Sequence, residues 1–91
     1  MSDDLAEIKR TAVQRPHDVQ AQMAAAYAHD RAGDEAAAIR YYDAAFALGI
    51  PSTEVRGFLV GYGSTLRNVG RADEAVAILA QAIADDPAYP P

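Results

Sequence analysis

The chain has 91 residues, a net charge of −5 and no cysteine, which predicts one small domain, residues 1–91, with a core filled largely by alanine. The acidic balance argues against nucleic acid and anionic membranes as partners, because their phosphate groups attract basic surfaces. The missing thiols exclude disulfides, cysteine nucleophiles and cysteine-ligated zinc, and they are compatible with the cytoplasm, where we expect the protein.

The first predicted helix spans residues 3–14. Ser2 is its expected cap, and Asp3 and Asp4 in the opening turn are stabilised by the positive end of the helix dipole. Apolar residues follow at helical spacing. Pro16 ends the helix, because a proline disfavours helical geometry in the residue before it.

Two further helices form a predicted first hairpin over residues 18–48. Asp18 caps the first of them, which ends near Arg31. Gly33 then provides the positive φ on which the chain reverses, and Asp34 caps the second helix. The joint has only two or three residues, so the two helices are expected to pack antiparallel.

A predicted second hairpin over residues 53–85 repeats this plan. Ser52 caps its first helix, Gly70 reverses the chain, and residues 86–91 form a short tail. Three glycines fall within the first helix of this hairpin: Gly57, Gly61 and Gly63. Each costs about 1 kcal/mol relative to alanine inside a helix, which indicates that another helix packs too closely there for a Cβ atom.

The chain contains an internal repeat. The stretch that begins at Gly33 recurs from Gly70, 37 residues later, with apolar residues at matching places. Such a period is typical of helical repeat arrays. Five small residues mark where we expect the helix axes to come closest: Ala38, Ala45, Gly63, Ala75 and Ala82.

These residues resemble the tetratricopeptide repeat (TPR) family, whose unit is a helical hairpin of about 34 residues. In the second hairpin the family's pattern positions are occupied by Leu59, Tyr62, Gly63, Leu66, Ala75, Leu79, Ala82 and Pro87. In the first hairpin they are occupied by Ala25, Ala26, His29, Ala38, Tyr42 and Ala45. Gln22 replaces the usual bulky anchor there, and Pro51 comes one place late. The turns are similar to those of a bacterial TPR subfamily of unassigned role.

The resemblance implies an all-α, right-handed solenoid of antiparallel hairpins with about five helices. It also implies a non-catalytic module that binds a peptide or a partner helix through the concave face, which the first helix of each hairpin lines. The positions carried over as partner-binding are Gln20, Met23, Tyr27, Arg31, Val60, Ser64, Arg67 and Asn68. The alternative is that these are ordinary solvated side chains. The family's clamp for C-terminal carboxylates needs Lys and Asn at set places, which this chain lacks.

No residue pattern predicts catalysis, a cofactor or a metal site. The chain has two histidines, His17 and His29, which lie twelve residues apart. His17 precedes a capping residue, and His29 stands at a position where the family has a packing tyrosine. We therefore interpret both as structural and expect no enzyme activity.

A second hypothesis is self-association. Two repeats are fewer than the three that a stable array usually needs, and the last helix is left with an apolar end face made of Val76, Leu79, Ile83 and Tyr89. Homodimerisation would cover this face. The remaining alternative is that the chain is a fragment that lacks its natural C-terminal cap.

Overall fold

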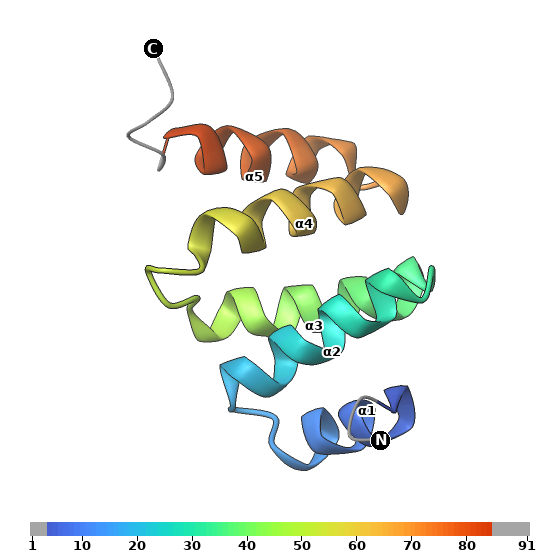
Figure 1. Cartoon of the computed structure of the whole chain (residues 1–91). Coiled ribbons are helices and arrows are strands. Elements are labelled where there is room, and N and C mark those ends of the chain that lie inside the picture. The colour runs from blue at the N-terminus through green and yellow to red at the C-terminus, as the bar shows by residue number, and fades with distance from the viewer. Residues whose placement is uncertain (1–3, 85–91) are drawn as a thin grey trace. The chain divides into compact units, whose positions relative to one another are not determined.

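The computed structural model describes residues 4–84, which form five α-helices and no strand. The helices are α1 (Leu5–Gln14), α2 (Val19–Arg31), α3 (Glu35–Leu48), α4 (Val55–Asn68) and α5 (Ala72–Ala84). They pack as consecutive hairpins within two compact units, Met1–Gly49 and Ile50–Pro91 (Figure 1). The predicted all-α hairpin architecture is confirmed. That residues 1–91 act as a single domain stays a prediction.

The first unit holds α1, α2 and α3, and α2 contacts both of the other helices. Its core is built of small residues: Ala25, Ala26, Ala38 and Ala45 are completely buried. Tyr42 is the large side chain that fills the space they leave. Alanine allows helix backbones to approach closely, so these helices make contact with little side-chain volume between them.

The turns at Gly33 and Gly70 have the same geometry. Gly33 has φ +81°, and the Asp34 N–H donates to the His29 carbonyl at 2.9 Å while the Gly33 N–H donates to the Asp30 carbonyl at 3.0 Å. This is the Schellman pattern, in which a left-handed residue after the helix satisfies its last carbonyls.

At Gly70 the φ is +89°, the Arg71 N–H donates to the Leu66 carbonyl at 2.8 Å, and the Gly70 N–H donates to the Arg67 carbonyl at 3.1 Å. The repeat seen in the sequence is therefore a repeat of backbone conformation, and it confirms the predicted chain reversals.

Aspartates cap the helices of the first unit. The Asp18 carboxylate accepts hydrogen bonds from the N–H groups of Gln20 and Ala21, and the Asp34 carboxylate accepts one from Ala37, as predicted.

The start of α1 differs from the prediction. Its cap is Asp4, which accepts from the Ala6 N–H at 2.9 Å, and Ser2 lies outside the described residues. The helix begins at Leu5 and not at residue 3, so the first backbone donors that need a cap are those that the Asp4 carboxylate can reach.

The start of α4 also differs. The helix begins at Val55 and not near residue 53, and its cap residue Glu54 makes no side-chain capping bond. The reason is a turn in which the Glu54 N–H donates to the Pro51 carbonyl at 2.9 Å, so that Ser52 lies inside the turn and cannot cap the helix. At the other end of this unit, α5 is described as far as Ala84, and Asp85 lies outside the described residues.

At Gly63 the Leu79 side chain of α5 packs directly against the backbone of α4. A Cβ atom at this position would lie 2.5 Å from both Cγ and Cδ2 of Leu79. The prediction that a glycine in this helix admits a neighbouring helix is therefore confirmed at Gly63. It is wrong at Gly57, where a Cβ would meet nothing within 4 Å.

Gln22 joins α1 to α2 by hydrogen bonds that the sequence did not reveal. The side chain is 4% exposed, and its Nε2 donates to the carbonyls of Ala12 at 2.9 Å and Arg15 at 3.0 Å. The Ala12 carbonyl lies at the end of α1, where Pro16, four residues later, has no N–H to donate to it. The Arg15 carbonyl also accepts from the Asp18 N–H at 3.1 Å. A glutamine in place of a bulky anchor therefore gives this hairpin a polar attachment for the preceding helix.

The two glycines of α4 provide a matched test. Gly63→Ala should lower the free energy of unfolding by about 1–3 kcal/mol, because the new methyl overlaps Leu79. Gly57→Ala should instead raise it by about 0.5 kcal/mol, because alanine restricts the unfolded chain and meets open space. Chemical denaturation of both variants measures the difference, and equal effects would contradict the assigned packing.

Removing the Gln22 side chain should loosen α1. Gln22→Ala removes the donor from the Ala12 carbonyl, whereas the Arg15 carbonyl keeps the Asp18 N–H, and the loss should cost about 1–3 kcal/mol. Hydrogen exchange should show the loss concentrated in the amides of α1. Gln81→Ala, at an exposed position of α5, is the control. Uniform loss of protection in both variants would contradict a local attachment.

Candidate partner-binding site

One side of α2 carries a row of accessible residues at helical spacing. Gln20, Ala24 and Arg31 are exposed and Tyr27 is half-buried. Their spacing of four, three and four residues keeps them on one side of the helix. We call Gln20, Ala24, Tyr27 and Arg31 the α2 stripe.

Met23, predicted to contact a partner, is not part of this stripe. Its side chain is 2% exposed and belongs to the core. It lies one step around the helix from Ala24, which occupies the exposed place. The resemblance to the family placed Met23 on the partner-binding surface, but a large apolar side chain serves a core equally well.

Tyr27 is held by the hairpin that carries it. Its ring meets the ring of Tyr42 edge to face, with centroids 6.0 Å apart and planes 68° apart. Tyr42 in turn donates its hydroxyl to Asp30 Oδ2 at 2.8 Å. The aromatic ring on the α2 stripe is therefore supported from inside by a buried tyrosine from α3, which limits its movement.

The second unit carries a comparable row on α4. Val60 and Arg67 are exposed and Ser64 is half-buried, and the three share one side of the helix, with exposed Asn68 beside them. We call Val60, Ser64, Arg67 and Asn68 the α4 stripe. All four predicted positions of this unit are accessible. The only charged residues within α4 are arginines, Arg56 and Arg67, although the whole chain is acidic.

His29 is used in packing. It is buried, its Nδ1 lies 2.8 Å from the Ala25 carbonyl, to which it donates, and its ring stacks on Tyr41 with centroids 5.2 Å apart. His17 is exposed in the turn before Asp18. Within residues 4–84, no three His, Asp or Glu side chains gather in a way that could hold a metal ion.

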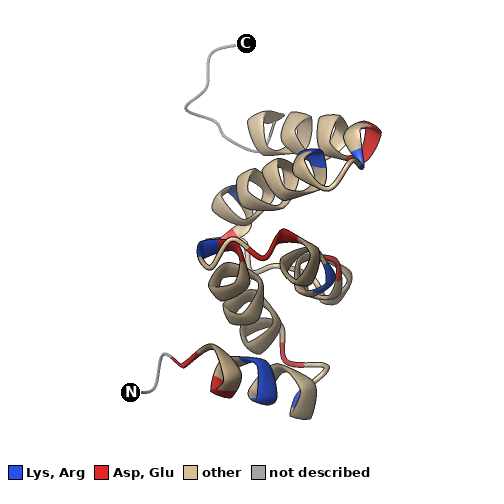
Figure 2. Cartoon of the chain, turned by 90° about the vertical axis from the view of Figure 1, so that its right-hand side faces the viewer, with Lys and Arg blue, Asp and Glu red and all other residues tan. Residues whose placement is uncertain are grey.

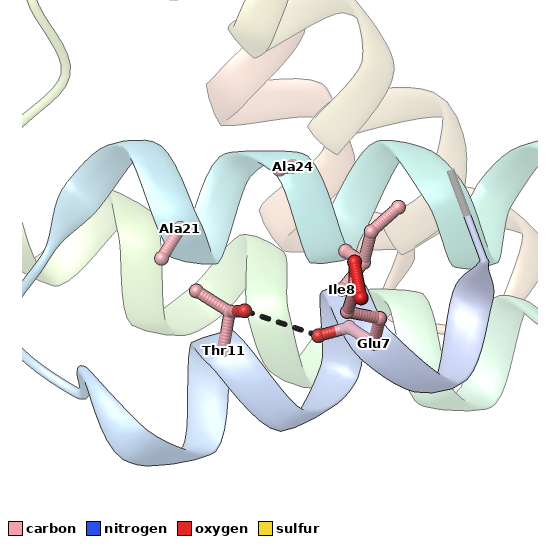
Figure 3. Close-up of a pocket in the computed structure, with 5 residues that line it drawn as sticks. All are labelled: Glu7, Ile8, Thr11, Ala21 and Ala24. Carbon is pink, nitrogen blue, oxygen red and sulfur yellow. Dashed lines mark hydrogen bonds between the residues drawn. The ribbon is translucent and has the colours of Figure 1, made fainter. Parts of the chain in front are cut away.

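A small hollow separates α1 from α2 (Figure 3). Its volume is about 130 Å³, and it is lined by Glu7, Ile8, Thr11, Ala21 and Ala24. The Thr11 hydroxyl already donates to the Glu7 carbonyl at 3.1 Å. The hollow exists because the side chains of Ala21 and Ala24 on α2 are too short to reach α1. Glu7 is the one ionisable residue in its lining, so the hollow contains no acid–base pair.

A larger hollow of about 290 Å³ lies between α4 and α5, lined by Arg56, Val60, Leu79, Ala82 and Ile83. Of the predicted apolar end face, Val76 and Ile83 are 70% and 55% exposed. Leu79 is half-buried, and its side chain packs against Gly63 of α4. Tyr89 lies outside the described residues.

The described chain is thus an all-helical repeat protein built of antiparallel hairpins. A family model described as "Tetratrico peptide repeat" matches residues 19–89, and the chain belongs to the tetratricopeptide repeat family. The match begins at the first residue of α2, so α1 lies before it. Comparison with curated proteins and with solved structures finds no match.

Membership of this family defines a module that generally mediates protein–protein interaction and is typically non-catalytic. Among residues 4–84, no helix combines the length and the apolar character needed to cross a bilayer. We therefore consider the α2 and α4 stripes as candidate surfaces for a protein partner.

Deleting the Tyr42 hydroxyl should weaken the support beneath Tyr27. Tyr42→Phe removes a hydrogen bond to a carboxylate and should lower the free energy of unfolding by about 1–2 kcal/mol. Tyr41→Phe makes the same chemical change on the neighbouring residue of α3 and should have a smaller effect. Thermal unfolding measures both, and equal shifts would contradict the role given to the Tyr42–Asp30 bond.

Proposed function

We propose that this protein binds a peptide or a partner helix through the α2 and α4 stripes. The observation that supports this most directly is that each stripe combines an apolar or aromatic side chain with an exposed arginine on one side of its helix. In the family, the first helix of each hairpin lines the binding surface, and α2 and α4 are those helices.

The side chains indicate the chemistry of the partner. Arg31 and Arg67 each present a planar guanidinium that binds a carboxylate through two parallel hydrogen bonds. Tyr27 and Val60 offer apolar contact next to these charges. The preferred partner is therefore a segment with acidic side chains spaced among apolar ones.

The charge distribution supports the same partner. The chain carries a net charge of −5, so acidic segments are repelled by most of its surface. Within α4, which contains no Asp or Glu, this repulsion is replaced by attraction to Arg56 and Arg67. An acidic peptide would thus be oriented toward α4.

The proposed function is non-catalytic. His29 donates to a backbone carbonyl and stacks on Tyr41, so its ring is engaged in holding α2 to α3. The binding of a C-terminal carboxylate by the family's clamp is not proposed, since Tyr27, Val60 and Ser64 occupy clamp positions.

Selection from a displayed library of random peptides tests the proposal. We expect enrichment of peptides that combine Asp or Glu with apolar residues. Arg31→Ala and Arg67→Ala should each weaken the binding of a selected peptide by about tenfold, because each removes a charged hydrogen-bonding pair. Both variants should keep the melting temperature of the parent protein, since both arginines are exposed.

Arg40→Ala is the matched control, because Arg40 is an exposed arginine on α3, outside both stripes. Peptides that bind Arg31→Ala, Arg67→Ala and Arg40→Ala equally well would show that the stripes are not the binding surface. Selection that yields no acidic peptides would show that the partner has a different chemistry.

A further inference from the structure

The hollow between α1 and α2 adjoins the α2 stripe. We call this recess of about 130 Å³ the α1–α2 hollow. Ala24 belongs to both features, because it is a member of the α2 stripe and also lines the hollow. Ala24 is exposed, so a segment bound along the stripe lies beside the hollow. One side chain of that segment can therefore enter it.

Most of the lining of the α1–α2 hollow is apolar. Ile8, Ala21 and Ala24 contribute only carbon atoms from their side chains. The Thr11 hydroxyl donates to the Glu7 carbonyl at 3.1 Å, so its proton is used within α1. An apolar cavity of about 150 Å³ accommodates one benzene molecule. A hollow of about 130 Å³ therefore has room for one side chain.

One end of the α1–α2 hollow carries a carboxylate. Figure 3 shows Thr11 and Ala21 at one end of the hollow and Glu7 with Ile8 at the other. Within the described chain, the Glu7 carboxylate has no hydrogen-bonding or ionic partner. The hollow thus combines apolar walls with an acidic end that is available to a bound cation.

The surroundings of Glu7 favour a positive charge at this end. Asp4 lies three residues before Glu7 and therefore shares its side of α1. In Figure 2 the red residues at the start of α1 are followed by blue ones. These are Lys9 and Arg10, and neither of them lines the hollow. The net charge of −5 attracts a cation to the chain as a whole.

We propose that the α1–α2 hollow binds a lysine side chain of the segment that occupies the α2 stripe. The inference rests on the function proposed above and adds a requirement for the partner. The methylene groups of the lysine lie against Ile8, Ala21 and Ala24, and its ammonium group donates to the Glu7 carboxylate. Long basic side chains commonly bury their stems in this way while the charged end stays near water.

Lysine matches the hollow better than other side chains do. Leucine would fill the apolar part but would remove water from the Glu7 carboxylate without replacing its hydrogen bonds. An acidic side chain would be repelled by Glu7. Arginine carries a planar guanidinium, which is larger than the compact ammonium of lysine. A hollow with room for one side chain therefore favours lysine.

The lysine site gives the α2 surface a direction. Glu7 attracts a positive charge beside Ala24, whereas Arg31, seven residues further along α2, attracts a negative one. A segment that carries both charges can satisfy both contacts in one orientation only. Reversing it would bring like charges together, which is unfavourable.

Nuclear magnetic resonance with Nα-acetyl-lysine amide tests the hollow directly. This probe presents a lysine side chain without a peptide, so the result does not depend on the α2 stripe. At millimolar concentrations the probe should shift the methyl resonances of Ile8, Ala21 and Ala24. Nα-acetyl-norleucine amide, which has the same stem and no charge, should bind about threefold more weakly, because it lacks an ion pair at an exposed position.

Glu7→Gln should abolish the preference for the lysine probe over the norleucine probe. Asp73→Asn is the control, since it removes the same charge from an exposed residue of α5, and it should keep the preference. Circular dichroism should show equal helix content in both variants. Unshifted resonances of Ile8, Ala21 and Ala24, or equal binding of the lysine probe to the parent and to Glu7→Gln, would overturn the proposal.

Peptides selected on the chain separate this proposal from the previous one. Exchanging the lysine of a selected peptide for norleucine should weaken its binding to the parent about threefold and should leave its binding to Glu7→Gln unchanged. Peptides that depend on Arg31 but contain no lysine would overturn the lysine site and leave the proposed function standing. A lysine probe that binds the hollow, with no peptide that depends on Arg31, would have the opposite meaning.

Discussion

The distance at which neighbouring helices of a hairpin can pack governs the described structure. Fully buried alanines hold α2 against α3, and Gly63 admits Leu79 so closely that no Cβ can be accommodated there. Because dispersion forces weaken rapidly with distance, short interhelical separations compensate for the small volume of the side chains between them. The Schellman turns at Gly33 and Gly70 make this possible, since they reverse the chain within a few residues and leave no slack between the paired helices.

A core of small residues gives each side chain little buried area, so polar contacts matter more than in a larger domain. Gln22 donates to the Ala12 and Arg15 carbonyls at the end of α1, and Tyr42 donates to Asp30 across the first hairpin. Both polar groups are tied to specific partners and therefore help to define a single packing arrangement. His29 belongs to the same class, as a polar ring whose hydrogen bond and stacking are used within the fold.

A core of small residues leaves exposed helix surfaces available for partners. The α2 and α4 stripes offer arginines within an acidic chain, which suits acidic segments.

Much of the fold was predictable from the sequence because helix boundaries, turns and repeats depend on local rules. Glycine spacing, capping aspartates and the period of small residues specify where helices start, reverse and repeat, and these rules correctly predicted five helices in hairpins and the family. The local rules were wrong about two helix caps. Asp4 caps α1 in place of Ser2. Ser52 lies within the turn closed by the Glu54 N–H and the Pro51 carbonyl, so it does not cap α4.

The tertiary structure alone decided which side of each helix faces inward. Met23 and Ala24 are adjacent in the sequence, and only the packing shows that Met23 lies in the core while Ala24 is exposed. Likewise, Gly57 and Gly63 look equivalent in the sequence, and only the position of Leu79 distinguishes them. Sequence patterns describe one helix at a time, whereas close approach is a property of two helices, so contacts between them become known only when both are placed.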